Sequence, residues 1–182
     1  MKQFMSKLML GAALIAGIAG AATKDNADYS DAGLAKKVAH EIRMYSRYTI
    51  WDNINVRVND GNVELMGEVS QPFKKADMTR LAQHVAGVRS VTNDLKVLPL
   101  SNFDDQLRLQ VARAIYRDPV LSRYSIQALP PIHIIVDNGH VRLEGVVNNE
   151  MEKNVAGIRA STGLSFGKVI NNLRVENPSR KS

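Results

Sequence analysis

Two histidines and two carboxylates lie around one short predicted hairpin and have the chemistry of zinc ligands. Counting back from the hairpin turn pairs His133 with Glu144 and Asp137 with His140. A structural zinc ion needs four such ligands at one point. These side chains instead form separate cross-strand pairs on the outward face, and Asn55 stands in the place of His133 in an earlier copy of the hairpin. We therefore expect a solvated sheet face and no metal site.

No other residue pattern predicts catalysis. The sequence lacks the G-x-S-x-G, Walker and H-E-x-x-H patterns. Asp104 and Asp105 precede an apolar-periodic run, where carboxylates act as N-terminal caps and dipole partners of a helix. Ser46 and Ser122 recur in matching surroundings and are interpreted as helix-end or turn residues. We predict that the protein is not an enzyme and holds no cofactor.

The most suggestive chemistry is a basic helix face with some apolar character. In the helix expected around residues 107–117, one face carries the core residues. A second face carries side chains at spacings of 4, 7 and 8 residues, namely Leu109, Arg113, Tyr116 and Arg117. Cationic and amphipathic side chains of this kind suit the headgroup region of an anionic membrane. A solvated helix face, or packing between domains, is the alternative interpretation.

These residues belong to a sequence that is written twice. At an offset of 78 residues, the stretch 54–97 aligns without a gap with 132–175. Both copies keep a turn glycine, an isolated strand glycine and a strand asparagine, which are Gly61, Gly67 and Asn93, and Gly139, Gly145 and Asn171. Two copies indicate a tandem duplication, because a solenoid needs at least three repeats.

Each copy predicts the same order of elements. In the first copy, apolar periodicity predicts helix, strand, strand, helix and strand over residues 31–45, 54–59, 62–69, 73–86 and 90–98. Pro72 can open the second helix, and Gly87 is expected to close it. The fold class is therefore α+β, with two tandem αββαβ units, each a three-stranded sheet covered by two helices. The second helix of the second copy has two glycines and few large apolar residues, so we expect it to be short or mobile.

Three kinds of position inside these elements carry specific structural expectations. Parity places Gly67 and Gly145 on the core face of their strands, where we expect a helix to cross closely over the glycine. Asn93 and Asn171 share the parity of the apolar residues, so each amide is expected to bond to a loop backbone. Trp51 is interpreted as a cap on the edge of the first domain, with an anchor for a partner as the alternative.

The first 22 residues predict export. Lys2 and Lys7 precede an apolar run of about 12 residues that leads into Ala19-Gly20-Ala21, an A-x-A-like cleavage site. The run is shorter than the roughly 20 residues that span a bilayer. We expect a cleaved signal peptide over residues 1–22, with a retained membrane anchor as the alternative, and a periplasmic mature chain.

The duplicated pattern of a helix, V-x-V, a turn glycine with x-V-x-L-x-G-x-V, a second helix and V-x-N-x-L-x-V resembles the BON domain. Two copies behind a signal peptide are similar to the osmotically inducible periplasmic (OsmY-type) proteins. The resemblance covers residues 30–98 and 103–176, which leaves 177–182 as a tail. It implies non-enzymatic roles and binding to phospholipid membranes or to unfolded envelope proteins. Some relatives are lipoproteins, whereas this sequence contains no cysteine.

The charge distribution narrows the expected partners. The formal net charge is +6, and residues 101–182 hold 11 lysines and arginines against 8 acidic residues. A dense basic stripe is missing, which argues against nucleic acid. We predict that the second copy binds anionic phospholipid membrane surfaces and that the protein supports envelope integrity or stress tolerance. The alternative is a stress-induced, chaperone-like or scaffold protein that binds other envelope proteins. The sequence does not predict the oligomeric state.

Overall fold

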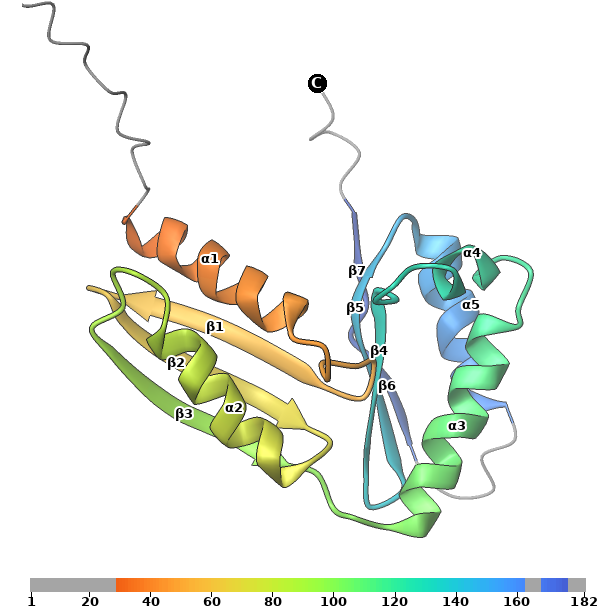
Figure 1. Ribbon diagram of the computed structural model, residues 1–182. Helices are drawn as coiled ribbons and strands as arrows, with labels where there is room; N and C mark the ends of the chain where they lie inside the picture. Colours follow the sequence, from red (N-terminus) through yellow and green to blue (C-terminus); the bar gives the residue numbers. More distant parts are fainter. Residues whose placement is uncertain (1–28, 163–167, 177–182) are drawn as a thin grey trace, which may run out of the picture.

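The computed structural model describes residues 29–162 and 168–176. The predicted signal peptide (1–22) and tail (177–182) lie outside these described residues. The described chain forms two α+β domains joined by a short linker after residue 97, and the two sheets lie against each other at an angle (Figure 1).

The first domain has the predicted order of elements. They are α1 (Asp31–Met44), β1 (Asn53–Asn59), β2 (Asn62–Val69), α2 (Pro72–Gln83) and β3 (Ser90–Val97). The sheet order is β1-β2-β3, with β1 antiparallel and β3 parallel to β2. Both helices cover one face of this sheet, where Val38, Leu65 and Met78 are buried in the core (Figure 1). Pro72 opens α2 as predicted, but the helix ends at Gln83, so Gly87 lies in the following turn and does not close it.

The second domain repeats this plan with two differences. Its elements are α3 (Asn102–Tyr116), α4 (Ser122–Ser125), β4 (Ile132–Asp137), β5 (His140–Val147), α5 (Glu150–Ser161), β6 (Val169–Asn171) and β7 (Arg174–Val175). The short helix α4 lies in the segment equivalent to residues 46–49, which form no helix in the first domain, and the third strand is divided into β6 and β7, which both pair with β5.

The expectation of a short second helix in the second copy was wrong. Helix α5 has 12 residues, as many as α2. Its small residues serve packing, because Ala156 and Ala160 are fully buried. At Gly157 an added Cβ would lie 2.8 Å from the side-chain nitrogen of Asn171. The glycine therefore leaves room for the third strand to approach the helix.

The hairpin turns adopt the predicted conformation, with positive φ at both central residues. Gly61 and Gly139 have φ of +74° and +78°, and the residues before them also have positive φ. Type I′ turns need this combination, which glycine and Asn or Asp tolerate. Each turn is held from the first helix of its own domain: Asp31 and Asp104 accept hydrogen bonds from the two turn N–H groups at 2.8–2.9 Å.

Asp104 therefore does more than the predicted capping. It is 1% exposed and binds the turn of a hairpin 34 residues away. The N-terminal cap of α3 is Ser101, whose Oγ accepts from the backbone N–H of Asp104. Asp105, the second predicted cap, forms an ion pair with Arg108 one turn along the helix. Asp104 thus joins α3 to the hairpin, whereas Asp105 lies at the surface.

The expectation that a helix crosses over Gly67 and Gly145 was wrong. The predicted register holds, since Gly67 pairs with Ile54 and Gly145 with Ile132. However, a Cβ on Gly67 would lie 2.1 Å from the backbone oxygen of Asn53. A Cβ on Gly145 would lie 1.9 Å from the backbone oxygen of Pro131, the residue before β4. The close backbone is therefore that of the neighbouring strand, and both glycines have a positive φ, +113° and +118°.

The two strand asparagines are hydrogen-bonded as predicted, but not to a loop. The side-chain nitrogens of Asn93 and Asn171 donate to the carbonyl oxygens of Lys75 and Lys153, both at 2.7 Å. These acceptors lie within α2 and α5. Each side-chain oxygen also accepts from the backbone N–H two residues further on. The repeated asparagine therefore fixes the second helix of each domain to its third strand.

Candidate functional site

Helix α3 presents three of the four predicted surface residues to solvent. Leu109, Arg113 and Arg117 are exposed, and Leu109 is 48% exposed. Tyr116 instead packs against the core of the second domain, and its hydroxyl donates to the carbonyl oxygen of Ile132 at 2.5 Å. Burial raises the pKa of this phenol. The structure therefore brings together an apolar residue and two arginines, and separates the tyrosine from them.

Arg113 and Arg117 supply exposed positive charge to this surface. Within residues 29–162 and 168–176, neither Arg113 nor Arg117 forms a salt bridge. They line a groove of about 410 Å³ together with Arg159, whose Nε lies 2.6 Å from Asp118. The N–H of Val120, and then the Arg159 guanidinium, lower the pKa of that carboxyl. The groove thus holds three guanidinium groups and one carboxylate.

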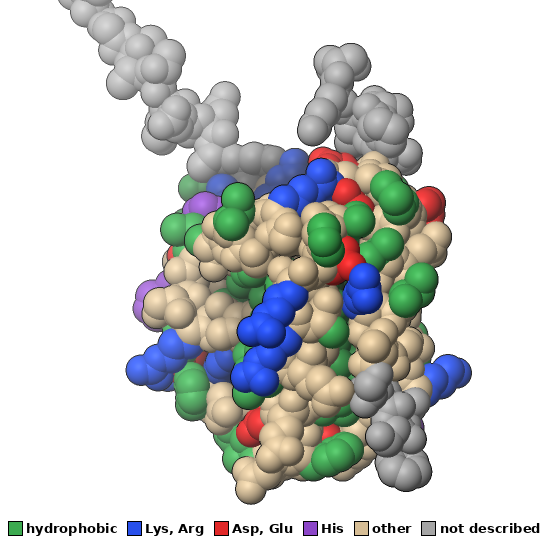
Figure 2. All heavy atoms as spheres, turned by 90° about the vertical axis from the view of Figure 1, so that its right-hand side faces the viewer, with side chains coloured by type: hydrophobic (Ala, Val, Ile, Leu, Met, Phe, Trp, Pro, Cys, Tyr) green, Lys and Arg blue, Asp and Glu red, His purple; other side chains and the backbone are tan. Residues whose placement is uncertain are grey.

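Exposed apolar side chains lie on the same side of the second domain as this basic groove (Figure 2). Figure 2 shows the side of the second domain that carries α3, α4 and α5, with hydrophobic side chains placed between lysines and arginines. Ile126 is 86% exposed, which is unusual for so large an apolar residue. Other exposed apolar residues of these three helices and their connections include Leu109, Val120, Met151 and Ile158. We call the surface formed by these residues and Arg113, Arg117 and Arg159 the basic-apolar face.

None of the described helices crosses a membrane by itself. In residues 29–162 and 168–176, no helix combines the length and the hydropathy that a bilayer span requires. In the same residues, no three His, Cys, Asp or Glu side chains gather as a metal ion would need.

The first domain inserts its β1-preceding loop into the second domain. Ile50 and Trp51 pack against the core of the second domain, and the carbonyl oxygen of Ile50 accepts from the N–H of Ile134 at 2.7 Å. The interpretation of Trp51 as a cap on its own domain was therefore wrong. Its indole joins the two domains.

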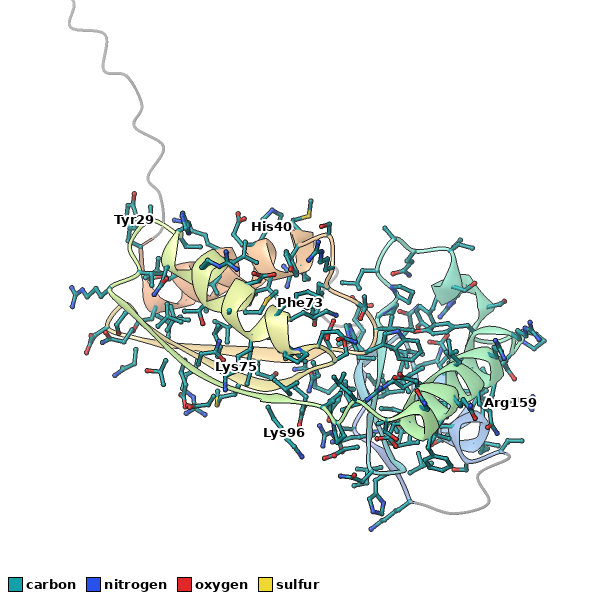
Figure 3. The ribbon with its side chains drawn as sticks, turned by 60° about the horizontal axis from the view of Figure 1, so that its bottom comes forward. Tyr29, His40, Phe73, Lys75, Lys96 and Arg159 are labelled. Carbon is teal, nitrogen blue, oxygen red and sulfur yellow. The ribbon has the colours of Figure 1, made fainter. Side chains whose placement is uncertain are left out.

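Ion pairs also connect the two sheets. Arg142 on β5 lies 2.6 Å from Glu68 on β2 and 2.9 Å from Glu144 on its own strand. Lys96 on β3 reaches Asp137 at 2.5 Å, and Figure 3 shows Lys96 on the side of the first domain that faces the second. Because these pairs are partly exposed, each contributes little to stability. We interpret them as contacts that fix the orientation of the two domains.

His133 lies in this interface, so the predicted solvated sheet face was wrong for it. It pairs with Glu144 in the predicted register. Its Nδ1 is 2.6 Å from the carbonyl oxygen of Asp52, and its ring centroid is 5.6 Å from that of Tyr48. Burial lowers the pKa of His133, although Asp52 and Glu144 oppose this shift. The neutral ring is therefore the form that suits the docked domains.

Acidification is expected to weaken domain docking through His133. Because its pKa is lowered in the docked state, the undocked or unfolded state binds more protons. Stability should then fall as pH drops below about 6.5 and level off once pH passes the lowered pKa. Thermal unfolding at about pH 7.5 and about pH 5 measures this difference. His133→Gln should reduce it, and His140→Gln, an exposed residue of the same hairpin, should not. Unchanged pH dependence in His133→Gln would contradict the assignment.

A buried charged network lies in the first domain next to this interface, and it includes Asp52, whose carbonyl oxygen contacts His133. Asp52 is fully buried and accepts from Thr49, from the N–H and Oγ of Ser70, and from Lys74 Nζ at 2.6 Å. Lys74 also donates to Ser70 Oγ at 2.9 Å. A lysine activates a serine only when it is neutral, whereas this ammonium donates to a carboxylate. The cluster is therefore a structural ion pair.

The second domain has the corresponding network with the charges exchanged. Glu152 occupies the position equivalent to Lys74 and is 3% exposed. It accepts from the Tyr124 hydroxyl at 2.5 Å, from the N–H of Asn148 at 3.0 Å, and from Arg123. Our sequence reasoning missed both networks. The signal was a charged residue on the buried side of each second helix.

Two αββαβ domains in tandem, each with a glycine hairpin and a helix-bound strand asparagine, define the class of BON-domain proteins. The BON domain profile matches residues 30–99 and 103–177, so the chain belongs to the BON domain family. A relative is the outer membrane lipoprotein DolP of Haemophilus influenzae. It is 28% identical over 165 residues, which are 88% of this chain and 82% of that protein.

Two solved structures give weaker similarities. CdsD, a structural protein of the type III secretion system of Chlamydia trachomatis, matches with a TM-score of 0.32 and 11% identity, over 79% of this chain and 92% of the other. The C-terminal domain of CdsD matches with a TM-score of 0.28 and 13% identity, over 79% and 98% of the two chains. These scores add nothing to the family assignment.

Proposed function

We propose that this protein is a non-enzymatic component of the cell envelope whose second domain binds anionic phospholipid surfaces through the basic-apolar face. The observation that carries the proposal is the position of Arg113 and Arg117. Both are exposed and lack a salt bridge to any described residue, and the exposed Leu109 lies beside Arg113 on the same helix. Similarity to an outer membrane lipoprotein supports a place in the envelope.

The physical argument combines charge and apolar burial. A basic group close to an anionic lipid surface contributes about 1 kcal/mol, and this contribution falls with salt. Exposed apolar residues such as Leu109 and Ile158 add the burial that holds a peripheral protein at the headgroup boundary. Neither contribution is large alone, so binding should need both the arginines and the apolar residues.

Replacing Arg113 and Arg117 together by glutamate is expected to abolish most of the binding. The mature chain, residues 23–182, is mixed with neutral or anionic vesicles at low and high salt, and flotation measures the bound fraction. The wild-type protein should float only with anionic vesicles, and less at high salt. Reversal of two charges changes the charge by four units, so at about 1 kcal/mol for each unit binding should weaken by roughly two to three orders of magnitude.

The matched control lies on the corresponding helix of the first domain. Lys36→Glu with Arg43→Glu on α1 makes the same change in net charge at two exposed positions. This control should keep most of the binding if the second domain makes the contact. Equal loss in both double variants would show that net charge, and not the basic-apolar face, controls binding.

One observation favours a protein partner as the second candidate. Ile126 and Ile158 are 86% and 65% exposed, which suits an apolar contact with another envelope protein. If the wild-type chain fails to float with any vesicle, this candidate takes precedence. Crosslinking from envelope extract, with Ile126→Ser as the comparison, then identifies the partner.

A further inference from the structure

A cavity of about 340 Å³ lies between the two domains. Its residues come from the end of the first sheet and the start of α2 on one side, and from α3 on the other, namely Trp51, Ser70, Gln71, Asp105, Arg108 and Leu109. In Figure 3, Phe73, two residues after Gln71, marks the end of α2 that faces the second domain. Small-molecule sites often occur at domain interfaces and begin at about 300 Å³.

The cavity has an apolar part and a cationic part. Trp51 and Leu109 supply apolar surface from the two domains. Arg108 is 5% exposed and donates from Nη2 to the carbonyl oxygen of Val136 at 2.9 Å, which holds the guanidinium in place. A ligand here should therefore be amphipathic, with its anionic group at Arg108.

The hydrogen bonds of Arg108 leave capacity for such an anion. Its Nε is buried and has no hydrogen-bond partner among the described residues. Its Nη1 binds Asp105, a neighbour on the same helix whose side chain is 61% exposed, and exposed pairs of this kind are weak. A carboxylate or phosphate binds guanidinium in a bidentate manner and can replace the exposed partner.

The start of α2 favours the same charge. Gln71 is the N-cap of this 12-residue helix and makes no side-chain capping bond, and the first turn contains no acidic residue. The partial positive charge of the helix N-terminus is therefore not offset by a carboxylate of the helix's own first turn. This feature adds to Arg108, which carries the argument.

We infer that the cavity between the domains binds a small anionic amphiphile, a single carboxylate or phosphate group joined to a short hydrocarbon chain. The apolar chain lies against Trp51 and Leu109, and the anionic group binds Arg108. Because residues of both domains line the cavity, the bound ligand stabilises the docked arrangement. This site shares Leu109 with the basic-apolar face, but its anion binds Arg108 and not Arg113 or Arg117.

Trp51 makes the test direct, because it is the only tryptophan of the chain. The mature protein is titrated with decanoate or decyl phosphate below the micelle concentration, or with decanol below its solubility limit, and tryptophan fluorescence is recorded. We expect a saturable change with the two anions and at least tenfold weaker binding of decanol. No change with either anion, or equal binding of decanol, would overturn the inference.

Three variants locate the response. Arg108→Gln should weaken decanoate binding at least tenfold, and Gln71→Phe should do the same by filling the cavity without removing the guanidinium. Arg113→Glu with Arg117→Glu should keep the decanoate response even though it loses flotation, which separates the two sites. Normal decanoate binding by a folded Gln71→Phe protein would place the ligand elsewhere and overturn the assignment.

Discussion

Replacing Lys74 by methionine is expected to lower the free energy of unfolding by about 3–5 kcal/mol, because a buried ion pair that loses one partner leaves an uncompensated charge. The charge left behind is Asp52, which is fully buried in the network that also contains Thr49 and Ser70. Its neutral hydrogen bonds cannot replace an ammonium 2.6 Å away. Urea unfolding followed by circular dichroism measures the loss.

Lys75→Met is the matched control for this prediction. Lys75 is the next residue on α2, and no side-chain hydrogen bond or salt bridge of Lys75 occurs within the described chain. Its replacement should change stability by no more than about 0.5 kcal/mol. Adding Asp52→Asn to Lys74→Met removes the orphaned charge and should recover part of the loss. A Lys74→Met protein as stable as the control would show that the pair does not stabilise the domain.

Gly145→Ala is expected to have a comparably large effect on the second domain. The new Cβ would lie 1.9 Å from the carbonyl oxygen of Pro131, and the residue has a φ of +118°. Backbone strain of about 1–3 kcal/mol and overpacking of about 1–3 kcal/mol therefore act together. Thermal unfolding should show a large decrease in the melting temperature of the full chain.

The control for this substitution is a glycine inside a regular helix. Gly33 lies in α1 and is not among the described glycines with a positive φ, so Gly33→Ala adds no backbone strain of this kind and should cost much less stability than Gly145→Ala. Gly67→Ala should repeat the Gly145 effect in the first domain. If Gly145→Ala behaved like Gly33→Ala, the close approach of the neighbouring strand would be wrong.

The fold was predictable because its strongest signals are local and occur twice. The turn at Gly61 fixes the register of β1 and β2, and the same count applied to Gly139 gives β4 and β5. Register then placed Gly67 opposite Ile54 correctly. Strand parity does not show which atoms approach a glycine in three dimensions. For that reason the prediction of a helix crossing over Gly67 was wrong.

The docking of the domains was not predictable from periodicity, because each domain alone satisfies the same pattern. His133 and Trp51 were assigned to one domain each, and both lie between the two. One signal was available: Ile135 is apolar at an outward position of β4, and it is 1% exposed. An apolar residue on the polar face of a strand should have indicated a covering partner.

The exposed residues of the candidate membrane surface were predicted in part, because the apolar spacing of α3 correctly indicated which of its sides faces the core. Arg113 and Arg117 are exposed, but Tyr116 is adjacent to the core stripe of the helix and finds a hydrogen-bond acceptor inside the domain. A tyrosine at the border of a stripe can face either way, and only the neighbouring strand decides. Arg159 was missed because it lies on α5, and the sequence did not show that α5 contributes to the same surface as α3.

The exchanged charges of the two buried networks also bear on how the chain reaches its native state. Neighbouring repeats of similar sequence can misassemble by exchanging equivalent segments. Here, exchange would place Asp52 beside Glu152, two carboxylates in a buried site, and Lys74 beside Arg123, two cations. An exchanged arrangement would therefore bring like charges together, whereas the native arrangement pairs opposite charges. We expect a chain that carries the first domain twice to refold with more misassembled product than the natural tandem, as size-exclusion chromatography after dilution from urea would measure.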